Sequence, residues 1–157
     1  MFLRLGEANP ENATIPPKSP TIINSHRNPT HSPIGFILGS LEYACKVSGA
    51  KVIIVLGHEN CGAIKSAVED VQLGNITALL AKIKPAVVKA SENYTGEKTS
   101  KNKKFLEVVT KTNIELTVDN IRQKSPILRE MEEKDLIKIA GAEYHMENGN
   151  VEFLNDK

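Results

Sequence analysis

The run Val52–Gly57 (VIIVLG) constrains the fold more than any other segment of this sequence. Its aliphatic, mostly β-branched residues do not alternate with polar ones, which is typical of a strand buried on both faces of a parallel sheet. Leu136–Ala142 (LIKIAGA) is a second run of the same kind. Parallel strands need long crossover connections, which are usually helical. The two runs therefore predict an α/β fold, with a mostly parallel β-sheet flanked by helices.

The segments around these runs carry helix signals. Ser40 is a candidate N-cap, and Ser125 comes directly before a proline that suits the first position of a helix. Apolar residues recur with helical spacing in the long stretch before Ser125. Helices are predicted over Leu38–Ser48, Gly62–Val71, Asn75–Ala90, Lys104–Lys124 and Pro126–Lys134.

A hairpin is predicted near the C-terminal end. The pair Asn148-Gly149 is a strong signal for a type I′ turn, because both central residues of that turn need positive φ. Tyr144–Met146 and Val151–Leu154 should form its arms.

Composition bounds the function classes. The 157 residues fit one domain, and a net charge of +1 gives no strong field that would draw the chain to nucleic acid or anionic lipid. No apolar run reaches the roughly 20 residues that span a bilayer, and the N-terminus has no apolar core like that of a signal peptide. Two cysteines are too few for a disulfide framework, so a reducing cytoplasm is the expected location.

The first 36 residues differ in composition from the rest. Six prolines lie between Pro10 and Pro33, and proline removes backbone donors and fixes φ. Residues 1–36 are therefore predicted to form an extended or disordered arm, and residues 37–157 the α/β domain. His26 and His31 lie in this arm and are expected to be solvated.

The residues that follow the first strand carry metal-ligand chemistry. His58 and Cys61 come directly after Val52–Gly57, and ligand sites in open α/β sheets gather at the carboxyl ends of strands. Imidazole and thiolate are preferred zinc ligands, and this spacing lets both reach one ion. Taken alone, the pattern also fits a loop histidine and a small cysteine buried by packing.

The wider sequence resembles the β-class carbonic anhydrases. Gly-His-x-x-Cys-Gly after a strand is similar to the second zinc motif of that family, and the likeness continues in register on both sides. The family holds zinc with two cysteines and one histidine, so the resemblance implies zinc as cofactor, carbon dioxide and bicarbonate as ligands, and His58 and Cys61 as metal ligands. Gly62 is then a candidate close-approach position in the substrate site. The matching segments are Ile37–Lys51, Cys61–Val87, Asn113–Tyr144 and Val151–Leu154.

The family's first zinc motif, Cys-x-Asp-x-Arg, does not occur in this sequence. Cys45 is the one cysteine before Cys61, and it lies in an amphipathic helix where burial in the core is the expected role. The resemblance therefore implies a β-carbonic-anhydrase-like fold that is truncated or altered at its N-terminus. No catalytic residue is assigned.

Three functions remain open from the sequence. The first is zinc-dependent reversible hydration of carbon dioxide, which requires other ligands to complete the metal site. The second is a catalytically inactive homologue that acts as an oligomer partner, and the third is an anion-binding module. A shortened parallel sheet exposes an unpaired edge, so a homo-oligomer, dimer or larger, is expected, as in the family.

Overall fold

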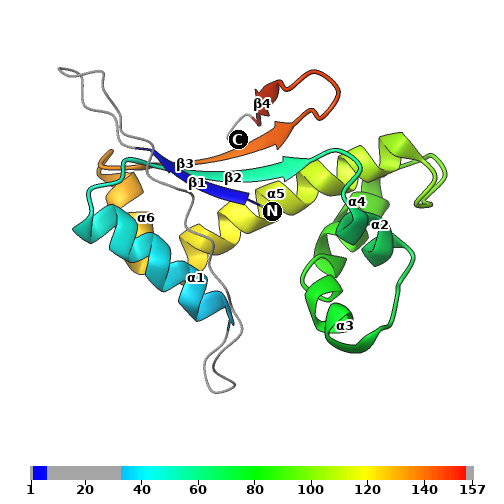
Figure 1. Cartoon of the computed structure of the whole chain (residues 1–157), viewed down its shortest axis with the longest axis horizontal. Coiled ribbons are helices and arrows are strands. Elements are labelled where there is room, and N and C mark those ends of the chain that lie inside the picture. Colours follow the sequence, from blue (N-terminus) through cyan, green and yellow to red (C-terminus); the bar gives the residue numbers. More distant parts are fainter. Residues whose placement is uncertain (1, 7–32, 155–157) are drawn as a thin grey trace. The chain divides into compact units, whose positions relative to one another are not determined.

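The computed structural model describes residues 2–6 and 33–154 of the chain (Figure 1). These residues divide into two compact units. Unit 1 contains Val55–Val118 and the segment from Gly141 onward, and unit 2 contains Leu3–Ile54 and Asp119–Ala140. No helix in the described part of the chain combines the length and the apolar character needed to cross a membrane.

The sheet has four strands in the order β1-β2-β3-β4. β2 and β3 run parallel, because the hydrogen bonds near their two ends advance in the same direction. Lys138 N donates to Lys51 O at 2.9 Å, and Glu59 N donates to Tyr144 O at 3.3 Å. β4 is antiparallel to β3, so the sheet is mixed. The predicted α/β fold is confirmed, and the two apolar runs are neighbouring parallel strands in it. The strands span Phe2–Gly6, Val52–His58, Lys138–Tyr144 and Val151–Phe153.

Helix α5 (Lys103–Lys124) packs closely on the unit 1 part of β2 and β3. A Cβ atom added at Gly57 in β2 would lie 2.6 Å from Ile114 Cδ1, and one added at Gly141 in β3 would lie 2.7 Å from Ile114 Cγ2. Ile114 itself is buried. Glycine at both strand positions is therefore what allows this helix to approach the sheet.

The other helices of unit 1 are short and enclose a single apolar cluster. They are α2 (Gly62–Val68), α3 (Gly74–Leu80) and α4 (Lys84–Asn93). The ring centroids of Tyr94 and Phe105 lie 5.1 Å apart, with Phe105 buried in this cluster and Tyr94 packed against it. Its buried members are Ile64, Ala67, Leu80, Ala86, Val87, Ala90, Phe105, Leu106 and Val109.

Unit 2 contains α1 (Pro33–Glu42), a π-helical turn (Tyr43–Val47) and α6 (Pro126–Glu133). Ser125 caps α6 as predicted, because its Oγ accepts a hydrogen bond from Leu128 N at 3.2 Å. The same hydroxyl donates to Glu42 Oε1 at 2.6 Å. Ser125 is fully buried, so this polar side chain is satisfied inside the unit.

Two helix predictions were wrong in their bounds. Helix α1 begins at Pro33, so Ser40 lies inside it and donates to Phe36 O at 2.9 Å instead of capping. Proline suits the first helical position because its missing N–H has no partner there in any case. The single helix predicted over Asn75–Ala90 is divided into α3 and α4, because Pro85 belongs to a first turn and not to a helix interior. Residues 7–32 of the predicted arm, with His26 and His31, lie outside the described residues.

The predicted hairpin exists with a different turn. Strand β3 runs without a break to Tyr144, and β4 pairs directly with its end. Of the predicted turn pair, only Gly149 has positive φ, at 75°, so the two-residue type I′ turn was wrong. A longer loop connects the strands, closed by a hydrogen bond from His145 N to Asn150 O at 2.8 Å.

Candidate metal centre

His58 is the last residue of β2 and is half-buried. Its Nδ1 lies 2.8 Å from the backbone carbonyl oxygen of Glu59. A carbonyl can only accept, so the hydrogen sits on Nδ1 and the other ring nitrogen, Nε2, keeps its lone pair. Metal-binding histidines are commonly oriented in this way by a backbone carbonyl.

Cys61 occupies the N-cap position of α2 and carries a free, half-buried thiol. The residue before it, Asn60, has φ of 55°, in the left-handed region that asparagine tolerates better than most residues. This turn brings the chain from the end of β2 into α2 within three residues. Both predicted ligands are thus placed by local backbone structure at the carboxyl end of a buried strand.

A cavity of about 180 Å³ with a mixed polar and apolar lining lies beside Cys61. Cys61 and Glu143 both line it, whereas His58 is not among its lining residues. The charged residues of the lining are four glutamates and one lysine, a balance that favours cations over anions. The lining residues are Glu59, Asn60, Cys61, Ile64, Lys103, Leu106, Glu107, Thr110, Glu143 and Glu147.

The remaining sequence candidates are also located. Gly62 is exposed at the first position of α2, and a Cβ atom there would meet no atom within 4 Å. Packing among the described residues therefore does not require this glycine, and its role beside a substrate stays a prediction. Cys45 is buried in unit 2, as predicted, and its burial raises the pKa of the thiol.

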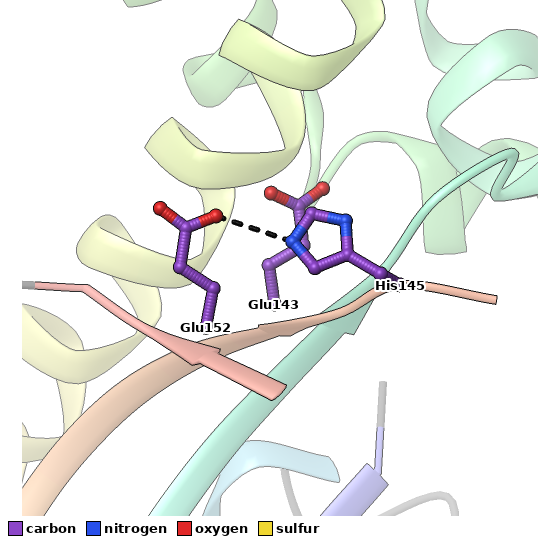
Figure 2. Close-up of side chains that lie close together, drawn as sticks. All are labelled: Glu143, His145 and Glu152. Atoms are coloured by element: carbon purple, nitrogen blue, oxygen red, sulfur yellow. Dashed lines mark hydrogen bonds and ion pairs between the residues drawn. The ribbon is translucent and has the colours of Figure 1, made fainter. Parts of the chain in front are cut away.

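A second group of potential metal ligands lies in the hairpin and is not apparent from the sequence alone. Among the described residues, the one group of three or more that lies close enough to share an ion is Glu143, His145 and Glu152 (Figure 2). It was missed because it depends on the register of β3 against β4, and the sequence signal was a Glu-x-His pattern followed by a glutamate beyond a turn. Glu59 adds to it, since its carboxylate accepts from Met146 N at 3.2 Å and lies 2.9 Å from His145 Nδ1.

Comparison with known proteins gives one consistent family. Residues 22–151 match the sequence model of the family described as carbonic anhydrase. A carbonic anhydrase of Mycolicibacterium smegmatis is 26% identical over 121 residues, covering 74% of this chain and 55% of that protein. One from Pseudomonas aeruginosa is 26% identical over 121 residues, covering 77% and 54%. The chain thus spans about half the length of these relatives.

Solved structures agree on the fold. A structure described as one of two tetrameric β-carbonic anhydrases from Sordaria macrospora superposes with a TM-score of 0.66 at 22% identity, over 82% of this chain and 63% of that one. The β-carbonic anhydrase CafA of Aspergillus fumigatus gives a TM-score of 0.65 at 20% identity, over 82% and 59%. At 20–22% identity, this structural similarity shows that the described residues share the β-carbonic anhydrase fold.

Proposed function

Because this chain belongs to the carbonic anhydrase family and has the β-class fold, we propose that it serves the zinc-dependent, reversible hydration of carbon dioxide to bicarbonate. The observation that carries the proposal is the family match over residues 22–151, which includes the His58-x-x-Cys61 pair at the end of β2. His58 and Cys61 are proposed as zinc ligands, and Gly62 as a residue that lets substrate approach them.

The chemistry of the two donors fits zinc. The carbonyl of Glu59 holds His58 in the tautomer that leaves Nε2 available, and Cys61 provides a sulfur donor at the N-cap position of α2. Catalytic zinc takes about three protein ligands and keeps a further position for water. Two donors therefore need at least one more, and no Cys-x-Asp-x-Arg motif occurs in the 157 residues to supply it.

The residues of this chain would bind the zinc ion and hold its ligands in a fixed orientation. A zinc ion, when bound, lowers the pKa of water to about 7 and so supplies a nucleophile for carbon dioxide at neutral pH. The main chain around His58 is fixed on both sides, because Glu59 O accepts from the ring and Glu59 N donates to Tyr144 O at 3.3 Å. This anchoring keeps the imidazole in a single orientation, which metal-binding histidines require.

We propose that the protein works as a homo-oligomer. Support comes from the Sordaria macrospora neighbour, whose structure is described as tetrameric. In unit 2, an apolar surface on α1 and the π-helical turn is exposed, and large exposed apolar surfaces are typical of protein–protein contacts. Its residues are Phe36, Ile37, Tyr43 and Val47. Light scattering at micromolar concentration should give a dimer or larger species, and a monomer would contradict this part of the proposal.

Zinc content and hydration activity test the proposed function. The purified full chain should bind about one zinc at this site and hydrate carbon dioxide. His58→Ala and Cys61→Ser should each remove both properties, whereas Cys45→Ala should keep them because Cys45 is buried in unit 2. A folded chain without hydration activity at saturating zinc would overturn the proposal and leave an inactive homologue, as an oligomer partner or anion-binding module.

A further inference from the structure

The pairing of β3 with β4 concentrates negative charge on one face of the hairpin. Glu143 and Glu152 are direct cross-strand partners, so their side chains leave the sheet on the same face. His145 lies two residues after Glu143 and follows the same face. Figure 2 shows the two carboxylates and the imidazole directed toward one another. Their nearest potential ligand atoms all lie within 4.8 Å of one another.

Glu143 is an unusual residue for a strand interior. Its side chain is 1% exposed, and neither carboxylate oxygen has a hydrogen-bond partner within the described residues. A buried carboxylate without hydrogen bonds is costly, and this burial raises the pKa of Glu143. A bound cation would remove that cost, since it would satisfy the oxygens and the charge together.

His145 is already held as a metal ligand would be. Its Nδ1 lies 2.9 Å from Glu59 Oε1, and its Nε2 lies 3.2 Å from Glu152 Oε2. A carboxylate on one ring nitrogen fixes the tautomer and orientation of a histidine whose other nitrogen binds a metal. In this geometry Glu59 is the orienting group, and Nε2 faces the space between Glu143 and Glu152.

Lys111 on α5 provides the counter-charge in the structure as it stands. Its Nζ lies 3.8 Å from Glu143, too far for a hydrogen bond, and 3.5 Å from Glu152, at the outer limit of one. The closest partner is Glu107, at 3.0 Å on the same helix. Lys111 can therefore keep Glu107 as its partner when a cation takes its place beside the other two carboxylates.

We propose that Glu143, His145 and Glu152 form a second divalent-cation site, separate from His58 and Cys61. One imidazole nitrogen and two carboxylate oxygens suit zinc, cobalt or manganese, with the remaining positions open to water. Glu59 positions His145, and Lys111 competes with the metal. The inference does not depend on carbon dioxide hydration, because no residue of the first metal pair belongs to this site.

Cobalt(II) titration of the full chain carrying His58→Ala and Cys61→Ser tests the proposal. This background should bind one equivalent of cobalt, and its spectrum should lack a thiolate-to-cobalt charge-transfer band. Adding Glu143→Gln or Glu152→Gln should weaken binding by more than about tenfold, since even groups that only orient ligands commonly contribute that much. Glu115→Gln, at an exposed position on α5, is the matched control and should change nothing.

Lys111→Met gives the opposite result under the proposal. Removing the competing ammonium should tighten cobalt binding, while a merely structural cluster would only lose stability. Absence of cobalt binding in the folded background protein, or binding that Glu152→Gln leaves unchanged, would overturn the inference. Either failure is distinguishable from failure of the proposed function, which is measured on the chain with His58 and Cys61 intact.

Discussion

The two groups of potential ligands in unit 1 are built in different ways. His58 and Cys61 lie on one short loop, where a strand end and a helix start fix both positions. Glu143, His145 and Glu152 come from two strands and depend on their pairing register. The first arrangement is encoded locally and is visible as a motif, whereas the second exists only in the folded protein. The difference shows that motif reading finds local sites and misses those assembled by strand pairing.

The strands that carry both groups pack against the same side chain of α5, Ile114. Because β2 and β3 meet different atoms of Ile114, the two contacts can be perturbed separately. Gly141→Ala should have the largest effect, with a loss of about 2–3 kcal/mol in the free energy of unfolding. The added methyl group would meet Ile114 Cγ2 at 2.7 Å, and this atom is attached directly to the rigid β-branched carbon. Urea unfolding measures the loss, and an unchanged midpoint would contradict the close packing of Ile114 on β3.

Gly57→Ala should have a smaller effect, about 1–2 kcal/mol. Its new methyl group would meet Ile114 Cδ1 at 2.6 Å and Cγ1 at 2.9 Å, with Thr110 Cγ2 at 3.1 Å, and this outer branch of Ile114 can move more than Cγ2 can. Ile114→Val removes Cδ1 and keeps Cγ2. The second substitution should therefore relieve Gly57→Ala in part and leave the cost of Gly141→Ala unchanged. Equal relief of both variants in a double-mutant cycle would show that the two strands do not contact different parts of Ile114.

The sequence predicted what periodicity and local signals encode. The two buried strands, α5, the Ser125 cap and the burial of Cys45 were all predicted, because each depends on a short segment. The break between α3 and α4 was not predicted, and neither was the observed hairpin turn. Asn148-Gly149 predicts a two-residue turn, but the hydrogen bond from His145 N to Asn150 O closes a longer loop.

The error in the predicted turn also hid the Glu143–His145–Glu152 site, because the turn sets the register of β3 against β4. A two-residue turn at Asn148-Gly149 would place His145 opposite Glu152, whereas the observed register places Glu143 there. A shift of two residues keeps the same side chains on the same face but changes which of them meet. The burial of Glu143 could not be predicted from the sequence either, because nothing about a charged residue in a strand indicates that a helix will cover it.

Asn60→Ala should lower stability moderately and should affect the two metal sites differently. Asn60 has φ of 55°, so alanine should cost about 1 kcal/mol, while Asn60→Gly should be neutral or slightly stabilising. Because Asn60 lies between His58 and Cys61, the alanine variant should also weaken zinc binding at that pair. Cobalt binding at the hairpin should change less, because of that site's residues only the positioning residue Glu59 lies next to Asn60. Equal weakening at both sites, measured by the two titrations, would show that they are not independent.

The smallest expected effect is a slope in stability against pH, measured on chelator-treated protein. Burial raises the pKa of Glu143, so above the ordinary glutamate range the folded state retains a proton that the unfolded state has lost. Stability should therefore fall as pH rises through the folded-state pKa of this carboxyl.

Neighbouring groups contribute to the same profile, so the comparison must be made between variants. Lys111 lowers the pKa of Glu143, whereas Glu107 and Glu152 raise it. The two flanking carboxylates raise the pKa of His145, whose stabilising contribution is also lost as pH rises. Glu143→Gln should flatten only the part of the slope that comes from Glu143, and Glu115→Gln should leave the whole profile unchanged. Parallel profiles for the parent chain and Glu143→Gln would mean that Glu143 stays ionised in the fold, with Lys111 as a sufficient partner. The Glu143 carboxylate would then need no bound cation, because Lys111 already neutralises its charge. The hairpin would differ from the His58–Cys61 pair only in where its charges lie.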